Sequence, residues 1–250
     1  MSNPFTDARP NLFLSAFFRS GSSHVKGTLL RLLPHYRAAT TVYSAGMIGG
    51  ENCDINIFGS QVLFAMPEQV FHQHTHGTDG NVAMLKQYGF RPIVQFRNML
   101  DSMVSVGELL STGQPQGLGI YYPDNWMKMG EHTKLWWLTK NLPNWYFTFY
   151  LSWMHADIEI LPIWYDIHYQ DQVAGIRKIL DFTGLSMLGN VSDDVIHEAA
   201  QTVDVTSRKK FGRPGRGKEI LSVEMIDDIK NQAMCWGTVG AELIQELIDR

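Results

Sequence analysis

The sequence predicts an α/β fold with a single domain, residues 1–250, in which helices flank a central parallel β-sheet. Short apolar runs alternate along the chain with longer segments of helical periodicity, which is typical of βα units on a sheet covered on both faces. Proline and glycine mark many boundaries between these segments. The 250-residue chain is also long enough to bury one large core.

The candidate strands are the short apolar runs, which are too brief for helices and are bounded by turn-forming or polar residues. They comprise residues 12–18, 40–44, 62–66 or 70–75, 91–96 and 159–164. Both alternatives for the third strand are open, because either segment has the length of a strand.

The candidate helices are the longer segments with helical periodicity, and Pro34 ends the first of them. They comprise residues 23–33, 80–88, 99–111, 125–140, 144–154, 172–183, 193–202 and 222–249. Two long loops remain, over residues 111–125 and 207–219. The second loop is basic and rich in glycine.

The composition argues against several classes of protein. A formal net charge of −4 disfavours a general binder of nucleic acid or anionic membranes, since such proteins carry a basic excess. Two cysteines are too few for a disulfide framework, and the first residues lack the pattern of a secretory signal. No apolar window reaches the roughly 20 residues of a membrane-spanning helix. We therefore expect a cytoplasmic protein with no nucleic-acid or membrane partner, and the sequence leaves its oligomeric state open.

A small polar turn follows the first apolar run, in the order Arg19, Ser20, Gly21, Ser22, Ser23. A strand that enters a helix through such a turn leaves backbone N–H groups unpaired at the helix N-terminus, where an anion is favoured. Arg19 adds a cation and the serines add hydroxyls. An ordinary βα turn with a serine cap stays open as an alternative. A Walker A loop does not fit, because the chain reads Lys-Gly-Thr where Gly-Lys-Ser/Thr is required.

A second arginine, Arg97, ends the apolar run at 91–96, and Asp101 and Ser105 follow it on a predicted helix. Together the two segments resemble the sulfotransferases that use 3′-phosphoadenosine 5′-phosphosulfate (PAPS). The run FFRSGSSHVKGTLL resembles the family's 5′-phosphosulfate loop. The run FRNMLDSMVS is similar to its R(N/D)PxDxxxS motif, with Met99 where proline is common. The resemblance implies that Arg97 and Ser105 bind the 3′-phosphate.

Two later segments extend the resemblance, which spans about residues 12–222 but rests only on helical character over 107–159. Tyr165 and Asp166 match the family's Tyr-Glu/Asp pair, and the loop at 207–219 resembles the basic loop that closes over the nucleotide. The implied fold is the P-loop-NTPase-like sulfotransferase fold. The implied nucleotide-binding residues are Arg19, Ser20, Gly21, Ser22, Ser23, His24, Arg97, Ser105, Tyr165, Arg208, Arg213, Gly215, Arg216 and Gly217.

Two departures from the family's pattern change the expected roles. His24 stands where many members have a tryptophan that stacks on adenine, so the base needs another aromatic partner. Arg19 stands where lysine is common. Because a guanidinium does not readily give up a proton, we expect Arg19 to act in catalysis through its charge and not as an acid.

Three histidines, His72, His74 and His76, alternate in the run VFHQHTH and would share one face of a strand. The family's KTH motif, to which this run is similar, implies that His76 is the general base, with His74 in the position of the lysine. His74 as the base, and a metal-binding or structural cluster, stay open as alternatives.

The expected activity is therefore transfer of a sulfuryl group from PAPS to a hydroxyl or amine of a small-molecule or carbohydrate acceptor, with PAP (adenosine 3′,5′-bisphosphate) as product and without a metal. A P-loop-like kinase or NTPase and a non-catalytic nucleotide-binding module are the alternatives. Five tryptophans could line an acceptor pocket or fill the core. They are Trp126, Trp136, Trp137, Trp145 and Trp153.

Overall fold

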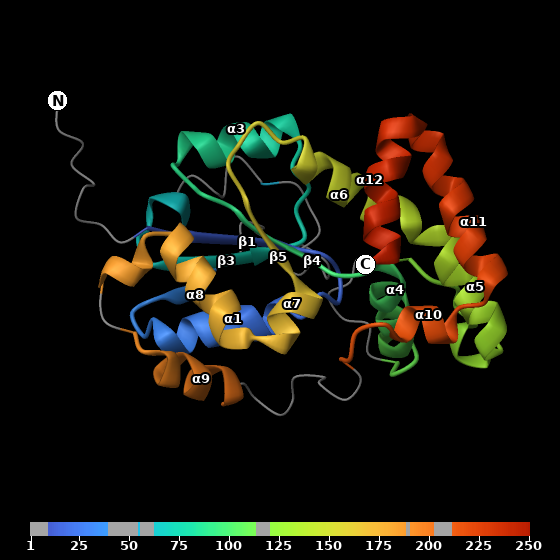
Figure 1. Cartoon of the computed structure of the whole chain (residues 1–250), viewed down its shortest axis with the longest axis horizontal. Coiled ribbons are helices and arrows are strands. Elements are labelled where there is room, and N and C mark those ends of the chain that lie inside the picture. The colour runs from blue at the N-terminus through green and yellow to red at the C-terminus, as the bar shows by residue number, and fades with distance from the viewer. Residues whose placement is uncertain (1–9, 40–54, 56–62, 114–120, 189–190, 203–211) are drawn as a thin grey trace.

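The computed structural model describes residues 10–39, 55, 63–113, 121–188, 191–202 and 212–250. Its centre is a five-stranded sheet in the order β2-β3-β1-β4-β5, in which every neighbouring pair is parallel (Figure 1). The predicted parallel sheet is thus confirmed. The strands are β1 (Leu12–Ala16), β2 (Arg37–Ala39), β3 (Gln69–Gln73), β4 (Ile93–Phe96) and β5 (Leu161–Trp164).

The side chains of β1 alternate between two cores, as the period of a strand requires. Leu12 and Leu14 pack with α1 (Ser22–Leu32), α8 (Gln172–Phe182) and α9 (Asp193–Gln201) on one face of the sheet. Phe13 packs into the other core, which includes residues of α3 (Asp79–Gln87) and α6 (Pro143–Met154). Both faces are covered, so every residue of β1, β3 and β4 is buried, including the polar ones.

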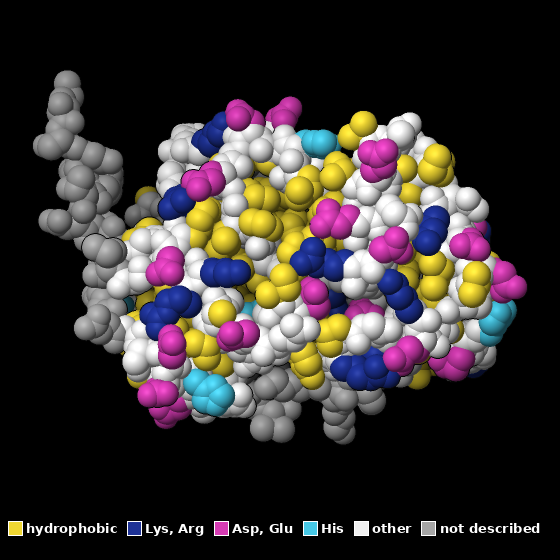
Figure 2. All heavy atoms as spheres, viewed as in Figure 1, with side chains coloured by type: hydrophobic (Ala, Val, Ile, Leu, Met, Phe, Trp, Pro, Cys, Tyr) yellow, Lys and Arg dark blue, Asp and Glu magenta, His cyan; other side chains and the backbone are white. Residues whose placement is uncertain are grey.

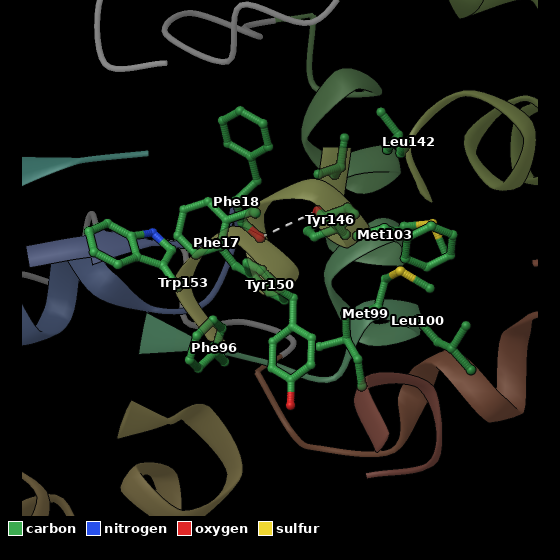
Figure 3. Packing of buried hydrophobic residues seen from close by; sticks show 14 of the residues in the cluster. Phe17, Phe18, Phe96, Met99, Leu100, Met103, Leu142, Tyr146, Tyr150 and Trp153 are labelled. Carbon is green, nitrogen blue, oxygen red and sulfur yellow. Dashed lines mark hydrogen bonds between the residues drawn. The ribbon is translucent and has the colours of Figure 1, made fainter. Parts of the chain in front are cut away.

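A group of helices beside the sheet enlarges the second core (Figure 1). It contains α4 (Met99–Leu110), α5 (Glu131–Asn141), α10 (Arg216–Ile220), α11 (Val223–Ala233) and α12 (Gly237–Asp249). Figure 3 shows Met99 and Met103 of α4 beside Tyr146 and Tyr150 of α6. Every residue of α4 except Glu108 is buried, so this helix is held firmly where it leaves β4.

The edge strand β5 carries apolar side chains, which gather over the middle of the molecule in Figure 2. Pro162 is exposed on this strand and has no N–H to offer to a further strand. Among the described residues, no helix combines the length and the apolar character needed to cross a membrane.

Several predicted boundaries differ from the observed ones. The first strand ends at Ala16, because Phe17 and Phe18 already begin the turn. The third strand is Gln69–Gln73, and residues 63–65 are helical, so the alternative at 62–66 is wrong. The predicted strand 40–44 lies outside the described residues, and the described strand β2 comes just before it.

Two predicted long helices are each interrupted at a glycine. The segment 125–140 divides into a 3₁₀ turn (Trp126–Lys128) and α5, with Gly130 at the N-cap of α5. The segment 222–249 divides into α11, a 3₁₀ turn (Met234–Trp236) and α12, because Gly237 has a left-handed φ of 73°. The short helices α7 (Tyr165–Gln170) and α10 are not predicted, since both are too brief to show periodicity.

The central position of β1 determines where a ligand can bind. Its neighbours β3 and β4 lie on opposite sides, so the chain connections diverge at the carboxyl end of β1. Open parallel sheets bind ligands in the crevice at such a point. The turn of Arg19, the last two histidines of the run (His74 and His76) and Arg97 all follow strands at this edge.

Candidate active site

The turn after β1 has an unusual backbone that side chains hold in place. Arg19 and Gly21 both have left-handed φ values, 63° and 81°. The Ser20 hydroxyl donates to Phe17 O at 2.9 Å, and Gln95 Nε2 donates to Ser20 O at 2.6 Å. A Cβ on Gly21 would lie 2.7 Å from Cε2 of Tyr165, so only glycine fits there. A strained arginine kept by several contacts is a feature of functional sites.

The N-terminus of α1 opens toward the same edge. Gly21 is the N-cap, and no side chain caps the helix. His24 and Val25 donate their N–H groups to Gly21 O, whereas the N–H groups of Ser22 and Ser23 have no acceptor among the described residues. With the helix dipole, these donors favour a bound anion.

Arg97 is buried, with 5% of its surface exposed, directly after β4. Its Nη1 donates to Arg19 O at 2.8 Å, and its guanidinium carbon lies 4.3 Å from the ring centre of Tyr165. Its Nη2 lies 3.9 Å from Oδ2 of Asp101, too far for a hydrogen bond. Among the described residues, Nε and Nη2 have no hydrogen-bond partner. Buried donors of a charged group need an acceptor, and an anion would supply it.

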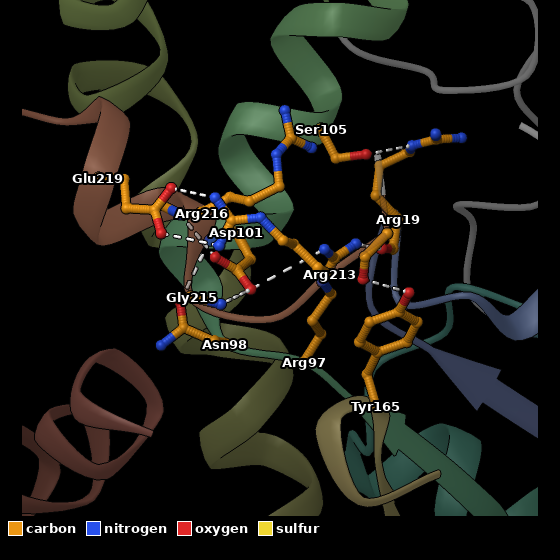
Figure 4. A network of polar contacts seen from close by, with 12 residues as sticks. Arg19, Arg97, Asn98, Asp101, Ser105, Tyr165, Arg213, Gly215, Arg216 and Glu219 are labelled. Carbon is orange, nitrogen blue, oxygen red and sulfur yellow. Dashed lines mark hydrogen bonds and ion pairs between the residues drawn. The ribbon is translucent and has the colours of Figure 1, made fainter. Parts of the chain in front are cut away.

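Ser105 lies on α4, and its Oγ accepts a hydrogen bond from Arg19 Nε at 3.0 Å (Figure 4). The structure therefore brings together Arg19, Arg97 and Ser105, which are far apart in the sequence. Two cations on neighbouring strand ends create a local positive region in a chain of net negative charge.

The glycine-rich loop is attached to α4 through Asp101, which is 2% exposed. Its Oδ2 accepts from Gly215 N at 2.9 Å and its Oδ1 from Gly217 N at 2.6 Å. A Cβ on Gly217 would lie 2.4 Å from the carbonyl carbon of Leu100, so glycine lets α10 touch α4. Tyr165 donates its hydroxyl to Gly212 O at 2.6 Å and ties the start of the described loop to Arg97 (Figure 4).

The basic residues of this loop have carboxylate partners. Arg213 forms a salt bridge with Glu219, and Arg216 forms one with Glu108 of α4. Arg208 lies outside the described residues. His24, at the position of the family's tryptophan, bonds through Nε2 with Ala200 O at 3.0 Å.

The three histidines do not share one face, because β3 ends at Gln73. His72 Nε2 lies 2.8 Å from Ser22 Oγ, His74 Nδ1 lies 2.6 Å from Ala16 O, and His76 Nε2 lies 3.1 Å from Thr148 Oγ1 of α6. The expected common face over residues 70–76 is therefore wrong. In the described part of the chain, no three histidine, cysteine or acidic residues are grouped so that they could bind a metal.

His74 differs from His76 in its environment. It is 8% exposed and its ring centre lies 4.6 Å from that of Phe18. Burial lowers the pKa of His74 to about 4, so its imidazole is neutral at neutral pH and carries a single proton. Because Ala16 O can only accept, Nδ1 carries the proton and Nε2 carries the lone pair. His76 is half-buried, with its ring 5.4 Å from that of Trp145.

The solved structures most informative for this arrangement are two complexes with PAP. The mouse sulfotransferase SULT7A1 complexed with PAP has a TM-score of 0.62 at 18% identity, over 95% of this chain and 89% of that one. A retinol dehydratase in a complex with retinol and PAP has a TM-score of 0.51 at 14% identity, over 97% of this chain and 82% of that one. The chain has the sulfotransferase fold. No protein-family model and no curated protein matches its sequence.

Within this sulfotransferase fold, the sequence did not predict the roles of two contributors to the site, since it did not single out Gln95 and named His72 only as part of the histidine run. Gln95 fixes the turn through Ser20 O, and His72 bonds with Ser22. Both are buried polar residues of β-strands. A polar residue in a buried strand needs a partner, and that is the signal by which the sequence could have indicated them.

Proposed function

We propose that the chain is a sulfotransferase that uses PAPS as donor, modifies a hydroxyl or amine of a small-molecule or carbohydrate acceptor, and releases PAP. The observation that supports it most is Arg97, a buried guanidinium that donates to Arg19 O and whose Nε and Nη2 have no hydrogen-bond partner among the described residues. It lies across the turn from the open N-terminus of α1. Two neighbouring anion sites suit a nucleotide with phosphates at both its 3′ and 5′ positions.

The residues present fit such a nucleotide. The N–H groups of Ser22 and Ser23 and the charge of Arg19 would bind its 5′ end. Arg97 and Ser105 would bind the 3′-phosphate, and Nε and Nη2 of Arg97 would gain the acceptors they lack. When bound, PAPS supplies an activated sulfuryl group. The two similar structures are complexes with PAP, which supports this assignment.

In this proposal a histidine removes the proton of the acceptor, and the hydrogen bonds favour His74 over His76. Ala16 ties the ring of His74 to the end of β1, beside the turn, whereas Thr148 ties His76 to α6. The lone pair of His74 is on Nε2 and its imidazole is neutral at physiological pH. The negative charge of PAPS bound nearby would raise the pKa of His74 and make its imidazole a stronger base. The family's KTH motif supports His76 instead, so both need to be tested.

Arg19 would stabilise the negative charge that develops on the departing phosphate. Its guanidinium is already oriented by Ser105, so little reorganisation is needed during the reaction. Gln95, Tyr165 and Asp101 act through the backbone of the two loops and position the binding groups. By analogy with phosphoryl transfer, positioning and charge stabilisation are the main contributions of the protein.

The surroundings of the two histidines favour a flat, apolar acceptor. Phe18 and Trp145 stack with ring centres 4.0 Å apart, and both contact His74. Phe149 adds a further ring beside His76. The similar retinol dehydratase structure contains retinol, an apolar alcohol, together with PAP. We therefore propose phenols and hydrophobic alcohols as the first acceptors to examine.

Release of PAP from PAPS, measured with panels of phenols, alcohols, sugars and amines, tests the proposal. The same assay with ATP and Mg²⁺ tests the kinase and NTPase alternative, for which the chain lacks the Gly-Lys-Ser/Thr sequence. We expect acceptor-dependent release of PAP and no turnover of ATP. Binding of PAP without turnover on any panel would instead indicate a non-catalytic nucleotide-binding module.

A further inference from the structure

His72 forms a buried hydrogen bond that the proposed reaction does not use. It lies on β3 opposite Leu14 of β1, and its Nε2 is 2.8 Å from the hydroxyl of Ser22, the first residue of α1. Both partners are 5% exposed. Burial, and then the neighbouring His74 and Lys26, lower the pKa of His72 well below its ordinary value. The ring is therefore neutral and carries one proton, on either Nε2 or Nδ1.

The position of that proton decides what Ser22 can offer to an anion. With the proton on Nδ1, the Ser22 hydroxyl would have to donate to Nε2 and would present only lone pairs to the anion. In either tautomer Nδ1 has no partner among the described residues, and a buried N–H without an acceptor is rarer in folded proteins than a buried acceptor without a donor. With the proton on Nε2, His72 donates to Ser22 Oγ, and the hydroxyl proton is left for another acceptor.

We propose that His72 is a positioning residue that orients the Ser22 hydroxyl as a hydrogen-bond donor toward the anion at the N-terminus of α1. This inference rests on the proposed function, because it assigns a 5′-phosphate or phosphosulfate to that position. His72 never touches the ligand and acts only through Ser22. The backbone N–H groups of Ser22 and Ser23 complete the same anion site.

Binding of two ligands by matched variants separates this role from a structural one. PAP has both phosphates, whereas adenosine 3′-phosphate lacks the 5′ group that Ser22 would contact. We expect His72→Leu and Ser22→Ala each to weaken PAP binding roughly 5- to 10-fold, the scale of one typical hydrogen bond. Binding of adenosine 3′-phosphate should be unchanged. His72→Gln, which keeps an N–H donor, should bind PAP within about 2-fold of the wild type.

The double variant that combines His72→Leu with Ser22→Ala should bind PAP no worse than Ser22→Ala alone, because both changes remove the same interaction. Additive losses, or equal losses for PAP and adenosine 3′-phosphate in His72→Leu, would overturn the role of His72. If the wild-type protein binds PAP and adenosine 3′-phosphate equally, the assignment of a 5′ anion site to the N-terminus of α1 is wrong, and the proposed function fails with it. A wild-type preference for PAP that His72→Leu keeps in full would overturn only the inference.

A measurement on the wild-type protein covers the case in which a variant does not fold. Nitrogen-15 NMR of the histidine rings reports which nitrogen of His72 carries the proton. We expect the proton on Nε2 both without ligand and with PAP bound. A proton on Nδ1 in the PAP complex would overturn the proposal.

Discussion

Arg97 Nη1 donates a hydrogen bond to the carbonyl oxygen of Arg19 across 2.8 Å, so the guanidinium that ends β4 supports the backbone of the turn that ends β1. The return contact runs through Ser105, which accepts from Arg19 Nε. Each of the two candidate anion sites therefore contributes to the geometry of the other. These bonds cross between neighbouring strand ends and hold the two candidate anion sites in a fixed position relative to each other.

Arg19→Ala tests whether this arginine stabilises charge that develops during the reaction. We expect turnover at saturating PAPS to fall by roughly 10²–10³, the scale of losing one preoriented electrostatic donor. Arg19→Lys is the matched variant and should recover part of the rate, since it retains a cation. Weaker PAPS binding with unchanged turnover at saturation would show instead that Arg19 binds the ground state and the transition state equally.

His74→Ala and His76→Ala, compared in one assay, identify the general base. If His74 is the base, its removal should lower turnover by roughly 10²–10⁴ with little effect on PAP binding, while His76→Ala should be much milder. His155→Ala, at an exposed position, is the control. A severe defect in His76→Ala with near-normal His74→Ala would move the base to His76. Equal loss of activity and stability in both variants would point to a structural role.

Gly217→Ala should detach α10 from α4. The added Cβ would lie 2.4 Å from backbone and side-chain carbons of Leu100, and neither helix can yield without moving Asp101. We expect a loss of about 1–3 kcal/mol in the free energy of unfolding, typical of overpacking, together with weaker PAP binding. Gly80→Ala, whose Cβ would meet no atom within 4 Å, is the control and should be neutral or slightly stabilising. Normal stability of Gly217→Ala in denaturant melts would contradict this packing.

Acid should destabilise the fold in part through His168, which is 4% exposed and has no partner for either ring nitrogen among the described residues. Burial, and then His24, lower the pKa of His168 to about 4, while Asp171 opposes the shift. Between the folded value and the ordinary value of 6.5, the unfolded chain binds more protons. The contribution of His168 to the free energy of unfolding is therefore complete above pH 6.5 and is lost as the pH falls toward 4.

The variant His168→Leu checks this contribution, which is on the order of 3 kcal/mol at most. The slope of the free energy of unfolding against pH, measured by denaturant melts between pH 7 and 4, should be smaller in His168→Leu than in the wild type. His197→Gln, at an exposed position, should leave the slope unchanged. An identical slope in all three proteins would show that His168 titrates normally in the folded state.

The sequence predicted the parallel sheet, because strand length and helix periodicity are local signals. Its resemblance to the sulfotransferases implied that Arg19, Arg97 and Ser105 belong to one nucleotide site, and the structure brings these three residues together. The sequence did not predict that β3 ends at Gln73, so it wrongly placed three histidines on one face. Where a strand ends depends on its neighbours in the sheet. The bonds of Ser22 with His72 and of His74 with Ala16 join residues more than 45 positions apart, and no local pattern encodes them.

The sequence likewise did not predict which residues pair with the arginines of the glycine-rich loop. From the sequence we expected Arg213 and Arg216 to bind a nucleotide, whereas in the structure they form salt bridges with Glu219 and Glu108. The second of these pairs depends on the contact between α10 and α4, which Gly217 permits. Asp101 was recognised from a motif, whereas its bonds to Gly215 and Gly217 required the structure.

The central claim is that this site binds a nucleotide with a 3′-phosphate through Arg97, and calorimetric titration with PAP and with adenosine 5′-phosphate tests it most directly. In buffer with a chelator, the wild type should bind PAP at least about tenfold more tightly than adenosine 5′-phosphate, the effect of a charge-assisted contact of roughly 1.5–3 kcal/mol. Arg97→Ala should abolish that preference and leave binding of adenosine 5′-phosphate nearly unchanged. Equal affinities in the wild type, or a preference that survives in Arg97→Ala, would contradict the account.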